Sequence, residues 1–81
     1  MVKLFSLTSR AALRKMLDNS GKSNAEVSRR LGRNVTFING YTTRGKAPSI
    51  NNLVRIATIC GYEVHLVGHD EDITVTVDET D

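Results

Sequence analysis

The sequence contains no tryptophan, one proline, one cysteine, two tyrosines and two phenylalanines among its 81 residues. The lone Cys60 cannot form an intramolecular disulfide, and we expect a small buried apolar side chain there. No apolar run approaches the ~20 residues that cross a bilayer, and residues 1–10 lack the apolar stretch and cleavage site of a secretory signal. These absences argue against a disulfide-stabilised secreted fold and a membrane protein, and they predict a cytoplasmic chain with no membrane partner.

Lysine and arginine are absent after residue 55. All eleven precede that point and are accompanied by only two acidic residues, so residues 1–61 carry a formal charge of +9, whereas residues 62–81 carry −7. A strongly basic body repels itself without a compensating partner, and basic surfaces are typical of proteins that bind nucleic acid. We therefore expect a polyanion-binding body, residues 1–61, followed by an acidic end, residues 62–81. A chain this short hides only roughly 60–65% of its surface, so a second copy would add stability.

Apolar side chains recur at helical spacing after polar capping residues. Thr8 or Ser9 can begin a first helix that ends at residues 19–21, and residues 23–26 fit a capping box in which Ser23 and Glu26 each bond the other's backbone N–H. Ser49 can cap a last helix that ends at Gly61. The positions predicted to face the core are Ala12, Leu13, Met16 and Leu17, then Val27 and Leu31, and finally Ile50, Leu53, Ile56, Ala57 and Cys60.

Between these helices, Gly32 ends the second, and Asn34 can cap a third that directs Ile38 and Tyr41 toward the core. Residues 44–48 are typical of a basic loop. Two short helices joined by a glycine turn are the arrangement that lays a recognition helix in the major groove of DNA.

Beyond Gly61 the apolar period changes from that of a helix to that of a strand. Residues 62–67 and 73–77 are rich in β-branched side chains, and residues 68–72 supply turn residues, so a β-hairpin is predicted. A hairpin this short is marginal on its own, and we expect its apolar set to form a dimerisation element. That set is Val64, Leu66, Ile73, Val75 and Val77. The predicted fold class is mainly α, with four helices and a C-terminal hairpin of two antiparallel strands.

The stretch KSNAEVSRRLGRNVTFINGYTTRGKAPSINNLVRIATICG, residues 22–61, resembles the Xre family of helix-turn-helix regulators, which includes phage Cro and repressor proteins. The matching features are the capped polar start, the Leu31–Gly32 turn, Ile38 in the recognition helix, the Gly-Lys loop at residues 45–46, and Pro-Ser before an aliphatic last helix. With the first helix included, the resemblance covers residues 7–61. It implies a four-helix repressor-like domain that binds double-stranded DNA.

The resemblance also implies which residues contact DNA. It makes Asn34 the cap of the recognition helix, and Arg33 and Arg44 bracket that helix, which suits them to phosphates. Val35 would meet thymine methyl groups, while Thr36 and Asn39 would hydrogen-bond base edges. The base-reading set is Val35, Thr36, Phe37, Asn39 and Gly40. The phosphate or minor-groove set is Asn24, Arg33, Asn34, Thr43, Arg44 and Lys46.

Two members of the base-reading set have a second interpretation. Phe37 suits packing against the last helix or a second subunit equally well. Gly40 lets the backbone approach DNA, but it equally marks fraying, because glycine inside a helix costs roughly 1 kcal/mol relative to alanine. The family often has long polar residues where this chain has Val35 and Gly40, so two-pronged readout of purines is less available. Ser28 stands where the family often has alanine, and we expect its hydroxyl to bond a helix carbonyl.

Other chemistry finds little support. Cys60, His65 and His69 have irregular spacing for zinc, and residues 69–72 lack the twelve-residue spacing of a calcium loop and are typical of a hairpin turn. The sequence holds no nucleophile–base pair, phosphate loop or catalytic pair of carboxylates. It therefore predicts a protein that is not an enzyme, with no metal and no cofactor.

Together these features predict a sequence-specific transcriptional regulator, a repressor from a phage, prophage or mobile element that binds an inverted-repeat operator as a homodimer. Two alternatives stay open. One is the antitoxin of a toxin–antitoxin pair, which represses its own operon and binds a toxin protein through its C-terminal segment. The other is an interaction module whose hairpin adds a strand to another protein.

Overall fold

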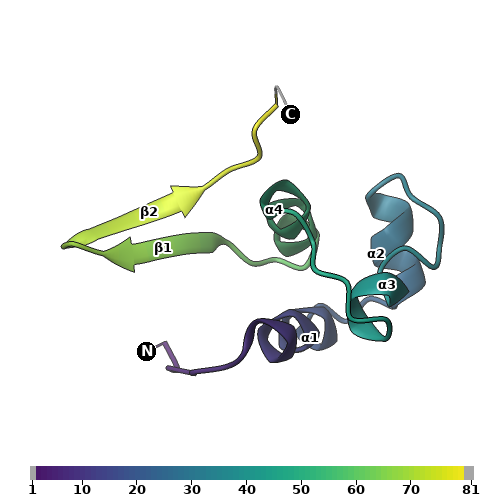
Figure 1. Ribbon diagram of the computed structural model, residues 1–81, viewed down its shortest axis with the longest axis horizontal. Coiled ribbons are helices and arrows are strands. Elements are labelled where there is room, and N and C mark those ends of the chain that lie inside the picture. Colours follow the sequence, from purple (N-terminus) through teal and green to yellow (C-terminus); the bar gives the residue numbers. More distant parts are fainter. Residues whose placement is uncertain (1, 80–81) are drawn as a thin grey trace.

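In the computed structural model, which describes residues 2–79, four helices precede a two-stranded antiparallel hairpin (Figure 1). The helices are α1 (Ser9–Asn19), α2 (Asn24–Arg30), α3 (Asn39–Thr42) and α4 (Ile50–Ile59). The hairpin consists of β1 (Val64–Gly68) and β2 (Glu71–Val75). This arrangement agrees with the mainly helical fold and the C-terminal hairpin predicted from the sequence.

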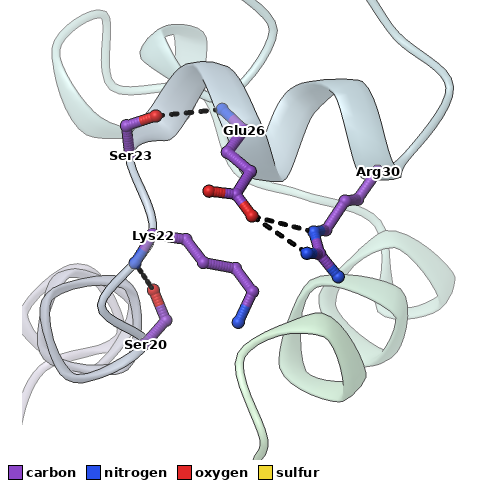
Figure 2. A network of polar contacts seen from close by, with 5 residues as sticks. All are labelled: Ser20, Lys22, Ser23, Glu26 and Arg30. Atoms are coloured by element: carbon purple, nitrogen blue, oxygen red, sulfur yellow. Dashed lines mark hydrogen bonds and ion pairs between the residues drawn. The ribbon is translucent and has the colours of Figure 1, made fainter.

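Serine and threonine caps begin the three longer helices. Thr8, Ser23 and Ser49 each accept a hydrogen bond from the backbone N–H three residues later. The predicted capping box is only half present, because the Glu26 carboxylate does not return to the Ser23 backbone. It pairs instead with Arg30 one turn later, at 3.0 Å, as Figure 2 shows. Ionic attraction at this spacing competes successfully with the backbone bond of the capping box.

The core lies among the four helices. Val27, Ile38 and Ile56 are completely buried at its centre. Around them lie the other buried members of the cluster, which are Leu13, Met16, Leu17, Tyr41, Ala57 and Cys60. Burial raises the pKa of the Cys60 thiol above its usual value. Cys60 is therefore the small buried apolar side chain that the sequence predicted, and its raised pKa favours the neutral thiol.

Two positions predicted to face the core are exposed. Ala12 is on the solvent side of α1, and Ile50 is 73% exposed at the start of α4. In place of Ile50, α4 buries Asn51 and Val54. The reason is the returning C-terminal segment, because the Asn51 side chain accepts from the Asp78 N–H at 2.9 Å and donates to the Asp78 carbonyl at 3.4 Å. A buried amide thus satisfies backbone groups that an isoleucine would leave unpaired.

The hairpin turn is shorter than predicted. Only His69 and Asp70 lie between the strands, both with positive φ, 48° and 59°, as a two-residue type I′ turn requires. Glu71 and Asp72, which were expected in the turn, belong to β2 and pair with Gly68 and Val67. The positive φ that Asp tolerates better than most residues lets a tight turn replace the five-residue loop expected from composition.

The hairpin extends away from the helical body, to the left in Figure 1. Its register pairs Val64 with Val75 and Leu66 with Ile73, so these apolar side chains share one face. At the base of the hairpin, Val64 packs against the helical core and Val75 is half-buried. Farther out, Leu66 is 61% exposed and Ile73 is 48% exposed. The outer part of the apolar face is therefore uncovered in the single chain.

None of the helices within residues 2–79 is both long enough and apolar enough to cross a membrane.

Candidate nucleic-acid interface

The segment predicted to be a recognition helix is only partly α-helical. The prediction started this helix after Asn34, but the regular helix α3 contains only residues 39–42. Before it, the Phe37 N–H donates to the Asn34 carbonyl and the Asn39 N–H to the Thr36 carbonyl, at 2.9 and 3.1 Å. These bonds span three residues, so the chain turns more tightly here than an α-helix does.

Ser28 explains the irregular start. In an α-helix the Ile38 N–H would donate to the carbonyl of Asn34, but here it donates to the Ser28 hydroxyl at 3.1 Å. The same hydroxyl donates to the Asn24 carbonyl at 2.8 Å, which is the bond to a helix carbonyl predicted from the sequence. Ser28 is completely buried, so it fastens the segment leading into α3 to helix α2.

A second polar contact joins α2 to α3 nearer the surface. The Asn24 side-chain amide donates to Asn39 Oδ1 at 3.2 Å and lies 3.5 Å from the Thr42 hydroxyl. Arg14 of α1 donates to the Thr42 carbonyl at the same junction. Asn24 was predicted to touch the DNA backbone, and in the structure its side chain positions Asn39.

Two predicted base-reading side chains lie on the open surface of this segment. Val35 is 44% exposed, and Thr36 is exposed as well. The Asn34 side chain accepts from both the backbone N–H and the hydroxyl of Thr36, at 3.0 and 2.9 Å. Asn34 was predicted to cap the third helix, but α3 begins at Asn39, so Asn34 caps only the turn that precedes it. It also fixes the rotamer of Thr36 while leaving the hydroxyl oxygen able to accept a further hydrogen bond.

Two other residues predicted to contact bases, Gly40 and Phe37, are turned toward the protein interior. Gly40 is buried, and a Cβ added to it would lie 3.4 Å from the Lys46 side chain, so it does not belong to the exposed surface. Phe37 is partly buried against the core and meets the Tyr41 ring edge to face at 5.3 Å. The packing of Phe37 agrees with its second interpretation, and the burial of Gly40 argues against a base contact there.

Arg33 takes a place beside Phe37. Its guanidinium lies 5.1 Å from the centre of the Phe37 ring, which is a cation–π distance. The side chain is thereby held at the edge of the surface that carries Val35 and Thr36. This position is compatible with the phosphate contact predicted for Arg33.

The loop after α3 supplies further positive charge. Thr43, Arg44 and Lys46 are all exposed, as the predicted phosphate contacts require. The Lys46 N–H donates to the Gly40 carbonyl at 3.0 Å, which folds the loop back on α3. Gly45 has a φ of +75° and lies so close to Arg10 that an added Cβ would be 2.8 Å from the guanidinium.

Sequence reasoning missed Arg10 and Arg14 as members of this surface. Both entered the sequence analysis only in the count of eleven basic residues, and nothing in a helical pattern indicates which loop they will approach. The structure places Arg10 beside the basic loop and Arg14 beside α3. We call the whole set, Arg10, Arg14, Asn24, Arg33, Asn34, Val35, Thr36, Asn39, Thr43, Arg44 and Lys46, the polar-basic surface.

The other predicted sites have the following positions. No group of three or more metal-ligating side chains occurs within the part of the chain that the structure describes. His65 pairs with Asp72 at 2.7 Å and lies 3.7 Å from Glu63, on the hairpin face opposite Leu66. Of the predicted dimerisation set, Leu66 and Ile73 are exposed, whereas Val64, Val75 and Val77 are half-buried near α4.

Comparison of the chain with models of protein families, with curated proteins and with solved structures finds no match. A functional assignment therefore depends on the polar-basic surface and on the hairpin themselves.

Proposed function

We propose that this protein is a sequence-specific DNA-binding transcriptional regulator with a repressor-like helix-turn-helix domain. The observation that carries the proposal is the polar-basic surface. Within it, Val35 and Thr36 are exposed on a segment that Ser28 fastens to α2. Arg33 precedes that segment in the chain, and Arg44 and Lys46 follow α3 in an exposed loop. Such a surface combines groups that read bases with groups that bind phosphates.

In this proposal the two groups have different tasks. Arg44, Lys46 and Arg33 bind phosphates and set the position of the protein on the duplex, which gives affinity without sequence preference. Thr36 and Asn39 hydrogen-bond base edges in the major groove, and Val35 contacts a thymine methyl group. Because Asn34 holds Thr36 and Asn24 holds Asn39, both readers are ordered before DNA arrives. Ordering in the free protein lowers the entropic cost of binding.

We further propose that two copies bind an inverted repeat, with the hairpin as the dimerisation element. The two recognition segments would then meet half-sites about 34 Å apart, one turn of DNA. Repression follows when the dimer occupies a promoter. The proposed activity is binding alone, with no catalytic step, metal or cofactor.

The first test is selection from a library of random-sequence DNA duplexes by the purified protein. We expect enrichment of an inverted repeat. On the selected duplex, log K should fall against log[salt] with a slope of about −5, because about six phosphates are neutralised at roughly 0.9 each. The double variant Arg44→Gln, Lys46→Gln removes four phosphate contacts from the dimer and should make this slope shallower by about 3.6. The matched variant Arg55→Gln, on the exposed side of α4, should leave the slope unchanged. An affinity independent of salt would contradict the proposal.

The acidic hairpin favours a second candidate function. Residues 62–79 contain six carboxylates and no lysine or arginine, and their outer apolar side chains are uncovered. Such a surface suits a basic protein partner, as in an antitoxin that binds its toxin. Co-purification of a small basic protein from the native host, lost in a Leu66→Asp variant, would favour this candidate. DNA binding is expected in both cases.

A further inference from the structure

An apolar groove of about 500 Å³ lies between the N-terminal segment and α1. Phe5 and Leu7 contribute apolar surface to it and remain 60% and 45% exposed. Lys3 and Lys15 line the same groove, and the Lys15 ammonium lies 4.4 Å from the centre of the Phe5 ring. The groove therefore offers apolar surface together with two positive charges, which fits an apolar and acidic occupant.

The groove continues to the base of the hairpin. Tyr62 and Glu63, the two residues before β1, complete its lining. The Asn19 side chain donates to the Tyr62 hydroxyl at 2.7 Å, which fastens this base to the end of α1. In Figure 1 the N-terminal segment lies on the β1 side of the hairpin. The groove and the free edge of β1 thus face the same region.

The two edges of the hairpin differ in how well they are protected. The edge strand β2 begins with Glu71 and Asp72, whose charges discourage further strand pairing. The sequence of β1, VHLVG, contains no lysine, proline or carboxylate, so its edge lacks the features that prevent another strand from adding to it. Of the two edges, β1 is therefore the one suited to pairing.

We propose that two copies of this chain pair along β1, antiparallel, so that the tip of each hairpin enters the groove of the other copy. The proposal rests on the homodimer of the proposed function and specifies its interface. A twofold axis at Leu66 sets Val64 opposite Gly68 of the second copy, and Tyr62 opposite its Asp70. Since strands rise about 3.3 Å per residue, the tip of one hairpin reaches the base of the other, where the groove lies.

Electrostatics favour pairing along β1 over an arrangement in which the apolar faces of two hairpins stack on each other. Each hairpin is acidic, so stacking alone would bring like charges together. In the crossed arrangement, Asp70 and Glu71 at the tip meet Lys3 and Lys15 of the other groove. The exposed side chain of Val67, next to the tip, covers apolar groove surface. Glu63 also lines the groove, and the two lysines outnumber it.

A charge exchange tests the proposal. Lys15→Glu and Glu71→Lys should each raise the dimer dissociation constant about tenfold, because two symmetry-related attractions become repulsions. The double variant should recover most of the loss. Glu71 is preferred to Asp70 for this test because lysine at the positive φ of Asp70 would strain the turn. Sedimentation of the full chain without DNA, at low salt, gives the dissociation constant.

Matched variants separate a local contact from net charge. Arg29→Glu, on the exposed surface of α2, changes the charge as Lys15→Glu does and should leave dimerisation within about twofold of wild type. Arg29→Glu combined with Glu71→Lys restores the net charge and should not recover dimerisation. If Lys15→Glu dimerises as well as Arg29→Glu does, the groove is not the interface, although the homodimer stands.

A parallel measurement on DNA distinguishes failure of the interface from failure of the proposed function. Binding of Lys15→Glu and wild type to a duplex holding one half-site should agree, because the groove does not take part in it. A wild-type chain that stays monomeric at all concentrations overturns both the interface and the homodimer. A monomer that still binds the half-site selectively leaves the DNA-binding proposal intact.

Discussion

Helix α4 runs for ten residues from its Ser49 cap, whereas α3 contains four residues and follows a run of tighter turns. The two segments contribute similarly to the core, since Ile56 of α4 and Ile38 before α3 are both completely buried. They differ in where their backbone N–H groups are satisfied. In α4 the N–H groups bond within the helix after the cap, while the Ile38 N–H leaves its own segment for Ser28.

This difference follows from residue type and from packing together. Val35, Thr36 and Gly40 have low helix propensity, so the segment before α3 gains little from regular helical bonds. A buried hydroxyl at Ser28 then offers the Ile38 N–H a partner that an alanine at this position would not. The conformation of the segment that carries the proposed base-contacting residues is thus set by a tertiary hydrogen bond. The conformation of α4 follows from its own sequence.

Removing the hydrogen bond between the Ile38 N–H and Ser28 should have the largest effect on the free energy of unfolding. Ser28→Ala leaves the Ile38 N–H without its partner in a fully buried position, and we expect a loss of about 2–3 kcal/mol in the free energy of unfolding. Urea unfolding followed by circular dichroism measures it. We also expect specific DNA binding to weaken beyond the loss of folded protein, because the segment carrying Thr36 is no longer fastened to α2.

Thr58 of α4 offers a matched control for Ser28. Its hydroxyl donates to the Val54 carbonyl at 2.9 Å, as Ser28 does to Asn24, and it is exposed. No hydrogen bond from a second segment to this hydroxyl is present within residues 2–79. Thr58→Val should therefore change stability by less than about 0.5 kcal/mol. Equal losses for the two variants would show that Ser28 acts only as a back-bonded hydroxyl.

Substitution of the proposed base-contacting side chains should have the next largest effect, on DNA affinity. Thr36→Ala and Asn39→Ala should each weaken binding to the selected duplex by about 1–2 kcal/mol and leave binding to random DNA nearly unchanged. Fluorescence anisotropy on both duplexes measures the difference. Asn39→Ala also loses its bond with Asn24, so its stability has to be measured alongside. Thr74→Ala, on the exposed β2 strand, should affect neither duplex. Equal losses on random DNA would assign Thr36 to folding or to phosphates.

The regular parts of the molecule could be predicted from the sequence, and the site only in part. Thr8, Ser23 and Ser49 cap their helices as expected, since capping depends on residues three positions apart. The packing of Phe37 was one of its two interpretations, because Phe37 lies one turn before Tyr41. The bond from the Ile38 N–H to Ser28, ten residues away, could not be predicted. Local periodicity contains no information about such a contact. For the same reason Asn51 was missed, as its partner Asp78 lies 27 residues farther along.

Removing the capping side chains of α4 and of the segment before α3 should have a smaller effect, on the free energy of unfolding. Ser49→Ala should cost about 1 kcal/mol, because the cap serves a full helix and the Asn52 N–H loses its acceptor. Asn34→Ala should cost less, about 0.5 kcal/mol, since the turn that it caps is exposed and irregular. Thermal and urea unfolding of both variants provide the comparison. A larger loss for Asn34→Ala would mean that the segment before α3 depends on its cap more than on Ser28.

The smallest effect is expected at Gly40. Its φ is not positive, and an added Cβ would meet only the Lys46 Cδ, at 3.4 Å, in a flexible side chain. Gly40→Ala should therefore stabilise the protein by about 0.5 kcal/mol, because alanine restricts the unfolded chain more than glycine does. Gly45→Ala is the contrasting variant: its φ of +75° and the nearby Arg10 guanidinium should make it destabilising by about 1 kcal/mol.

Since Gly40 is buried, specific DNA affinity of Gly40→Ala should equal that of wild type. A stabilised variant with weakened specific binding would show instead that the backbone at Gly40 approaches DNA closely, and that α3 turns outward when the duplex binds.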